Sequence, residues 1–197
     1  MTARQRIITP VGRTAWCHVL NPRESLGGKM VWDVALEIDE QYIKQYSAIA
    51  RELIETARSG DPNFPRADNG FTYPWMESRG PKDEAGNLGD IIPGKWLIKA
   101  KRNAVRTRGG TQERNTAPIL QDGLGQPIKP GTLESIPPST EARLMLDLFA
   151  YHQGVNAGVS AGLVGMQIKK LGATDTFDPL EGFDAVENGD NDDHGGF

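Results

Sequence analysis

The sequence predicts a mainly β fold: a small barrel of five or six strands with one α-helix, long loops and an acidic C-terminal tail. Short segments in which apolar and polar residues alternate recur along much of the 197-residue chain, and this period of two is typical of strands. The 23 glycines and 13 prolines favour many turns over a helical bundle. Only one segment shows a long, clear helical period.

The N-terminal part of the chain predicts three strands. Residues 4–20 contain apolar clusters separated by Pro10 and Gly12, which indicates a strand, a bend and a second strand. Residues 21–29 are rich in Asn, Pro and Gly and predict a turn. Residues 30–38 alternate between apolar and polar side chains, so they predict the third strand.

The helix is predicted from Asp39 to Ser59. Its apolar residues recur at steps of three and four and form one stripe: Ile43, Tyr46, Ile49, Ala50, Leu53, Ile54 and Ala57. Asp39 or Glu40 favours the N-terminal end of the helix dipole, and Gly60 can end the helix.

The rest of the body is predicted to be loops and strands. Residues 60–94 are rich in Pro and Gly and predict a long loop, of a length that is usually functional or disordered. Residues 94–108 alternate sharply at first and predict a strand. Residues 117–131 predict a strand, an Asp-Gly turn and a strand. Residues 139–152 allow either period and are interpreted as a strand, and residues 163–171 predict the last one.

Five or six strands with one helix in mid-chain are typical of the oligonucleotide-binding (OB) barrel. We therefore predict an OB-fold-like domain over residues 1–170 and a flexible, disordered acidic tail over residues 171–197. The tail holds six Asp and two Glu and lacks Lys and Arg, so its formal charge is −8. Because the whole chain carries −4, residues 1–170 carry +4. The body is thus basic and the tail acidic.

Several classes of protein are disfavoured by composition. The chain has no run of about 18 apolar residues, which a membrane-spanning helix needs, and its N-terminus lacks the apolar stretch of a signal peptide. Cys17 is the only cysteine, so an intrachain disulfide is impossible, which suits a reducing cytoplasm.

A basic segment is the first candidate site. Residues 91–112 carry six basic side chains and no acidic one: Lys95, Lys99, Lys101, Arg102, Arg106 and Arg108. The three lysines share one face of the predicted strand, at about 6.6–7 Å per two residues. Such a row can follow the phosphates of single-stranded DNA, with counterion release as the driving force. The alternative is a solvated edge strand whose lysines oppose aggregation.

Aromatic side chains supply the second candidate feature, because single-strand binders stack bases on them. The candidates are Tyr73 and Trp75 in the long loop, and Phe149 and Tyr151 beside Arg143 on the outward face of residues 139–152. Trp32 and Trp96 are expected in the core, while Trp16 is left open.

The motif "GVSAG" at residues 158–162 matches the nucleophile elbow of serine hydrolases, with Ser160 as the nucleophile. Its context does not fit, because the following residues alternate like a strand and His194 lies in the predicted tail. Glycines here better suit a bend in a barrel strand. We predict that the protein is not an enzyme. The three histidines and one cysteine show no metal-ligand spacing, so no metal or cofactor is expected.

The tail offers candidate contacts for a partner protein: Asp190, Asp192, Asp193 and Phe197. A terminal phenylalanine presents an apolar ring and a carboxylate together, which suits a small pocket with a basic rim. An acidic tail can also compete with DNA for a basic groove. Residues 177–183, "FDPLEGF", are either a short docking segment or pack back on the barrel. The alternative for the whole tail is a solubilising role.

Residues 94–190 resemble a family of bacteriophage single-stranded DNA-binding proteins of the OB-fold type. The resemblance rests on "GKWLIKAKRN", "APILQDGLGQPI", "GVSAGLVGMQIKKLG" and "DPLEGFDAVENGD", and on Tyr73-Pro74 before the basic strand. It implies that the acidic tail binds replication proteins such as DNA polymerase or primase-helicase. Gly195 and Gly196 depart from the more usual acidic or proline-containing ending.

The sequence therefore predicts a protein that binds and protects single-stranded DNA without sequence preference, in phage DNA replication, recombination or repair. Its expected location is the cytoplasm of the infected bacterial host, as a possible homo-oligomer. The alternative is a phage structural or assembly protein whose tail docks on a partner.

Overall fold

A computed structural model describes residues 3–66, 70–82, 84–108 and 110–173. The predicted disorder of the tail and its candidate contacts lie outside these residues. The strands are β1 (Arg4–Ile8), β2 (Gly12–Glu24), β3 (Met30–Asp39), β4 (Trp75–Arg79), β5 (Ile91–Asn103), β6 (Val105–Arg108), β7 (Thr111–Arg114), β8 (Ile119–Gln121), β9 (Glu141–Gln153) and β10 (Asn156–Lys170), and the helix is α1 (Glu40–Gly60).

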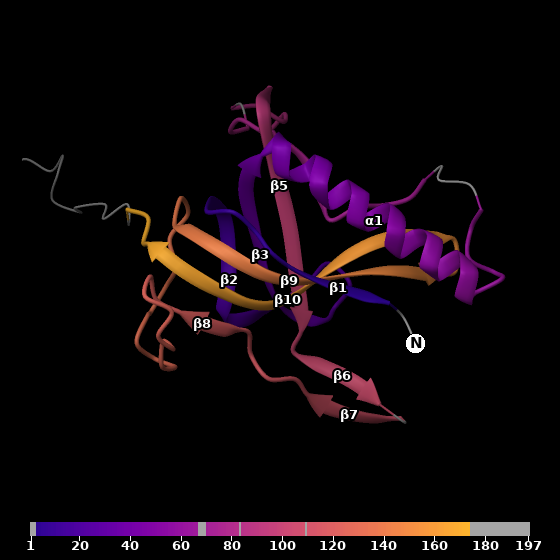
Figure 1. Cartoon of the computed structure of the whole chain (residues 1–197). Helices are drawn as coiled ribbons and strands as arrows, with labels where there is room; N and C mark the ends of the chain where they lie inside the picture. The colour runs from indigo at the N-terminus through magenta and orange to yellow at the C-terminus, as the bar shows by residue number, and fades with distance from the viewer. Residues whose placement is uncertain (1–2, 67–69, 83, 109, 174–197) are drawn as a thin grey trace, which may run out of the picture.

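Five strands form a closed ring of hydrogen-bonded neighbours in the order β9, β2, β3, β5, β10, with β10 pairing back to β9. The β5–β10 pairing is parallel and aligns Lys101 with Gly162, whereas the other ring pairings are antiparallel. Figure 1 shows these long strands crossing one another in the body of the molecule. The predicted mainly β, OB-like architecture with one helix is confirmed.

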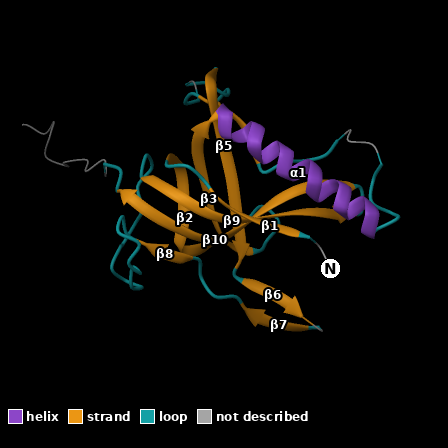
Figure 2. Ribbon diagram, viewed as in Figure 1, coloured by secondary structure: helices purple, strands orange, loops and turns teal. Residues whose placement is uncertain are grey.

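The other strands extend this ring. β1 pairs with β9, β8 pairs with β10, and β4 pairs with β5. β6 and β7 form a separate two-stranded hairpin, which Figure 2 shows projecting from the side of the barrel away from α1.

The helix begins directly after β3, with Asp39 as its N-cap, and its predicted stripe faces the core. Ile43, Tyr46, Ala50, Leu53 and Ile54 are buried among the leucines of β9. Leu144, Leu146 and Leu148 are fully buried, so the strand interpretation of residues 139–152 is confirmed. Burial of the Tyr46 ring raises the pKa of its hydroxyl to about 12.

The prediction of one long loop over residues 60–94 is wrong in part. Residues 75–79 form β4, and β5 already begins at Ile91. Both strands are stabilised by pairing with each other, for example Trp75 with Ile98, which no local pattern of the loop reveals. The predicted strand over residues 94–108 breaks at Ala104, where the chain leaves the barrel and enters β6.

Three other boundaries also differ from the prediction. β2 continues to Glu24 through an irregular stretch after His18, so the predicted turn over residues 21–29 is shorter. The second strand predicted within residues 117–131 is reduced to a single bridge between Gln121 and Pro127. β10 begins at Asn156, because its glycine-rich start pairs with β9 despite carrying few large side chains.

Candidate nucleic-acid interface

The lysines of β5 point outward where the strand crosses the middle of the barrel. Ile98 and Ala100 are buried, whereas Lys99 and Lys101 are exposed, as alternation along a strand requires. The Lys99 ammonium lies 5.5 Å from the centre of the Trp16 ring. Both side chains cover Ala35, the cross-strand neighbour of each, which is fully buried.

A second cation–aromatic pair lies on β1 and β9, on the other side of β10. Arg4 and Phe149 are directly opposite in the β1–β9 register, and the Arg4 guanidinium lies 5.3 Å from the centre of the Phe149 ring. Phe149 in turn aligns with Ser160 on β10. Between the two pairs, Gly162 aligns with both Lys101 and Asp147. Because Gly162 has no side chain, no side chain projects from this position between the two pairs.

These six residues form one outward-facing surface, here named the cationic-aromatic face: Arg4, Trp16, Lys99, Lys101, Phe149 and Tyr151. Among the described residues, Arg4, Lys99 and Lys101 make no ion pair. Each positive charge at the two ends of the face is therefore adjacent to an aromatic ring, a geometry worth about 0.5–1 kcal/mol at exposed sites.

Carboxylates near the face accept hydrogen bonds from residues outside the three cations of the face. Asp147 accepts hydrogen bonds from Arg6, at 2.8 Å from Nε, and this contact lowers the pKa of the Asp147 carboxyl. Asp33, the cross-strand neighbour of Lys101, accepts from Arg23 at 2.6 and 2.9 Å and from the Trp16 indole at 3.3 Å. Positive charge on Lys101 is thus only partly offset by its neighbour.

The segment from Thr72 to Trp75 fills the seam where β5 and β10 separate. The Thr72 N–H donates to Ala157, the Val159 N–H donates to Thr72, and the Lys99 N–H donates to Pro74. Gly158 has a φ of +154°, and a Cβ there would collide with the Thr72 carbonyl oxygen. Glycine at this position therefore permits the close approach of the two chains.

Two of the predicted stacking residues lie at this seam. Tyr73 stacks on Trp75, with ring centres 5.4 Å apart. Trp75 pairs with Ile98, and cross-strand partners point to the same side of a sheet. Trp75 therefore lies on the core side of β5, opposite Lys99, and it packs partly buried against the core. Tyr151 reaches the seam from β9 and shares a hydrogen bond with the Thr72 hydroxyl.

The remaining predicted contacts are dispersed. Lys95 lies 2.6 Å from an Asp39 oxygen, which raises the pKa of its ammonium. It lines a cavity of about 390 Å³ with Arg13 and the carboxylates of Glu37, Asp39 and Glu141.

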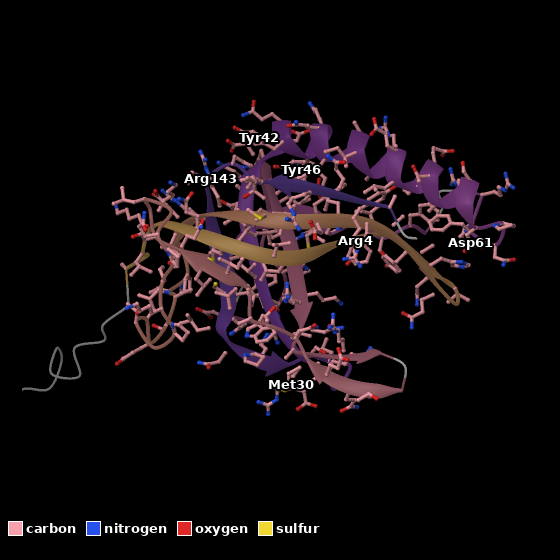
Figure 3. The ribbon with its side chains drawn as sticks, turned by 60° about the horizontal axis from the view of Figure 1, so that its bottom comes forward. Arg4, Met30, Tyr42, Tyr46, Asp61 and Arg143 are labelled. Atoms are coloured by element: carbon pink, nitrogen blue, oxygen red, sulfur yellow. The ribbon has the colours of Figure 1, made fainter. Side chains whose placement is uncertain are left out.

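The arginines are dispersed as well. Arg106 pairs with Glu113 at 2.9 Å on the projecting hairpin, and Arg102 donates to the Thr116 hydroxyl at 2.9 Å. Arg143 is exposed near the start of β9, well apart from Arg4 in Figure 3. Arg108 lies at the end of β6.

Sequence reasoning did not select Arg4 and left Trp16 open. Arg4 lies in an N-terminal strand whose register with β9 places it at Phe149, a contact between distant parts of the chain. Residues 4–8 do not alternate between polar and apolar side chains, so no local pattern points to Arg4; once they form a strand, Arg4, Arg6 and Ile8 share one face. Trp32 and Trp96, expected in the core, are buried and partly buried against the core, respectively.

Ser160 does not occupy a nucleophile elbow. It lies inside β10, which stays paired with β9 on both sides of it, and no helix follows. Cys17 is inward-facing, with its sulfur 3.7 Å from that of Met166, and burial raises the pKa of its thiol to about 12. In the described part of the chain no group of three His, Cys, Asp or Glu side chains is arranged to hold a metal, and no helix has the length and hydrophobicity needed to cross a bilayer.

Solved structures with a similar fold include proteins of two bacteriophages. The chain matches gp2.5, a single-stranded DNA binding protein encoded by bacteriophage T7, with a TM-score of 0.64 and 15% identity, over 95% of this chain and 98% of that chain. It matches the single-stranded DNA-binding protein from bacteriophage Enc34 in complex with ssDNA, with a TM-score of 0.57 and 15% identity, over 85% and 88% of the two chains.

A further structure of the single-stranded DNA-binding protein from bacteriophage Enc34 gives a TM-score of 0.57 at 13% identity, over 89% of this chain and 86% of that chain. No protein-family model matches the sequence, and no curated protein matches it. At these identities the likeness concerns the fold. Over most of its length, the chain shares the fold of these phage single-stranded DNA-binding proteins.

Proposed function

We propose that the protein binds single-stranded DNA, without sequence preference, on the cationic-aromatic face. The observation that carries the proposal is the pairing of exposed cations with aromatic rings across the barrel, Lys99 with Trp16 and Arg4 with Phe149. The fold supports it, since one of the similar structures is a phage protein in complex with ssDNA.

The chemistry of the face fits an unpaired strand. Lys99, Lys101 and Arg4 can contact phosphates, which releases counterions. The Phe149 and Trp16 rings can stack on bases, and every base has a face that stacks. In OB folds, the surface of the second and third barrel strands binds oligonucleotides. Here those strands are β3 and β5, which carry Ala35 and Lys99 at the Trp16 end of the face.

The other predicted DNA contacts remain proposals at the margins of this surface. Lys95 and Arg106 would have to exchange a carboxylate partner for a phosphate. Tyr73 would receive a base at the seam beside β5, and Trp75, which packs against the core, would have to turn outward to do so. Arg102, Arg108 and Arg143 would extend the path beyond both ends of the face.

We extend the proposal to biological context. Binding would protect single strands during phage DNA replication, recombination or repair in the cytoplasm of an infected bacterium, with a homo-oligomer as one form of the protein. Asp190, Asp192, Asp193 and Phe197, which lie outside the described residues, would recruit replication proteins such as DNA polymerase or primase-helicase. The charge of −8 on residues 171–197 supports a second role, competition with DNA for the basic body.

The decisive experiment is a titration of labelled oligonucleotides, single- and double-stranded, at several salt concentrations. For a single strand that contacts Z phosphates, the logarithm of the binding constant should fall with the logarithm of salt concentration with a slope near −0.7Z. Homopolymers of different bases should bind with similar affinity. Absence of salt-sensitive binding, together with a defined oligomer, would instead favour a structural or assembly protein.

The tail is tested by deleting residues 184–197. We expect severalfold tighter binding at low salt and little change at high salt, because the competing negative charges are screened there. Fluorescence anisotropy of the same oligonucleotides measures both. Equal or weaker affinity at low salt would remove the competition role while leaving DNA binding itself intact.

A further inference from the structure

An exposed apolar row crosses four strands on the outside of the barrel, farther along β1 and β9 than Arg4 and Phe149 of the cationic-aromatic face. Ile8 on β1 aligns with Met145 on β9, Met145 aligns with Gly165 on β10, and Gly165 aligns with Ile119 on β8. Ile8 and Ile119 are 60% and 59% exposed. Apolar side chains gathered in register, rather than scattered singly, indicate a surface that is covered by something.

The row surrounds a small pocket of about 130 Å³. Ile8, Ile119, Met145 and Val164 are among its apolar walls, and Arg143, Gln121 and Gln167 also line it. A cavity of about 150 Å³ with apolar walls accommodates a benzene molecule, so the pocket has the size of one aromatic ring. Arg143 makes no ion pair with the described residues, so a carboxylate beside the ring would be favoured.

This pocket lies beside the cationic-aromatic face, and Arg143 is the one proposed DNA contact among its lining residues. Met145 lies four residues before Phe149 on β9, which at about 3.3 Å per residue is about 13 Å along the strand. Its walls are apolar, in contrast to the cations of the cationic-aromatic face.

We propose that the pocket is the docking site of the chain's own segment 177–183, "FDPLEGF", with the Phe177 ring in the pocket. Leu180 supplies further apolar surface to cover Ile8 and Ile119. Asp178 and Glu181 supply the carboxylates that Arg143 lacks. This contact within one chain goes beyond the proposed function and does not depend on DNA binding.

The path of the described chain supports this occupant. The Gly172 N–H donates to the Thr140 hydroxyl at 3.0 Å, so the chain passes close to the start of β9 as it leaves β10. Leu144, in the pocket wall, is four residues beyond Thr140, about 13 Å along the strand. Four residues also separate Ala173 from Phe177, a reach of about 13–14 Å. The chain from Ala173 to Phe177 is therefore long enough to reach the pocket without a long loop, and short loops lose less entropy on closure.

Methyl NMR of the full-length chain tests the proposal. Isoleucine methyl groups are labelled with carbon-13, and the signals of Ile8 and Ile119 are assigned through Ile8→Val and Ile119→Val. We expect both signals to shift when Phe177→Ala removes the ring, and to show nuclear Overhauser contacts to the Phe177 ring before it is removed. The buried Ile43 methyl on α1 is the internal reference and should not move.

Phe183→Ala is the matched control, since it deletes an equal ring from the same segment and should leave the Ile8 and Ile119 signals nearly unchanged. The proposal is overturned if Phe177→Ala moves neither signal, or if Phe183→Ala moves both as much. A shift that disappears on dilution also overturns it, because the ring would then come from a second copy. None of these outcomes depends on whether the protein binds DNA.

Discussion

Two lysines of β5, Lys95 and Lys99, lie four residues apart in opposite surroundings. The Lys95 ammonium lies 2.6 Å from an Asp39 oxygen, in a cavity that Glu37 and Glu141 also line. The Lys99 ammonium lies over the Trp16 ring and has no ion pair with a described residue. The two lysines point to the same side of the strand by alternation. Their neighbours on β2 and β3 therefore decide which positive charge is available to a phosphate.

Removing the available charges gives the largest expected effect. Lys99→Ala with Lys101→Ala should weaken single-strand binding about 100-fold, since each hydrogen bond to a charged group contributes about 1.5–3 kcal/mol. The salt slope should flatten by about 1.4 for two lost phosphate contacts. Anisotropy titrations at several salt concentrations measure both. Lys44→Ala with Arg51→Ala removes the same charge from exposed positions on α1, and should change affinity much less.

Removing the Phe149 ring tests the aromatic member of the Arg4–Phe149 pair. Phe149→Ala should weaken binding about tenfold, because loss of one stacked base costs about 1–3 kcal/mol. The salt slope should stay unchanged, since no phosphate contact is lost. Phe149→Tyr keeps the stacking ring and should retain most of the affinity. A flattened slope in Phe149→Ala would mean that the ring acts only by positioning Arg4.

Substitution of Lys95 should weaken DNA binding much less. Lys95→Ala is expected to weaken binding no more than about threefold, because Asp39 already neutralises this ammonium and exposed pairs contribute about 0–1 kcal/mol. Asp39→Asn frees the lysine and should tighten binding if the strand of DNA extends this far. If Lys95→Ala loses as much DNA affinity as Lys99→Ala, the contrast between these two lysines is wrong.

The smallest effect is expected from substitution of Arg6, because its guanidinium is already paired with Asp147. This effect is on the stability of the fold. Asp147 has a pKa below its ordinary value because Arg6 donates to its carboxylate, so the pair stabilises the fold once pH is above about 4. That contribution is lost as pH falls through the lowered pKa and the carboxylate is protonated. Arg6→Gln should therefore be slightly less stable than wild type in urea unfolding at pH 7. The difference should shrink at pH 3, and an equal difference at both pH values would contradict the assignment.

The sequence could predict much of the fold because several elements carry their own pattern. The leucines of β9 and the stripe of α1 are local periodicities, and the core they form needs no further information. β4 was missed because residues 75–79 become a strand through pairing with β5. That pairing depends on the seam that Gly158 and Thr72 create.

The candidate site was less predictable for the same reason. The outward directions of Lys99 and Phe149 follow from alternation, but their neighbours do not. Trp16 meets Lys99, and Arg4 meets Phe149, only through the registers of different strand pairs. The carboxylate beside Lys95 comes from the end of β3, which the charge count of residues 91–112 could not include.

Closure of the barrel also determines how neighbouring copies can meet. The five ring strands use their backbone groups on both sides, and the border strand β1 presents Arg4 and Arg6 along the outer face. The opposite border, β8, is only three residues long, and β4, which pairs with β5 outside the ring, is five residues long. Charged and short borders disfavour strand-to-strand polymerisation. Separate copies of the barrel should thus have little tendency to join edge to edge into fibres.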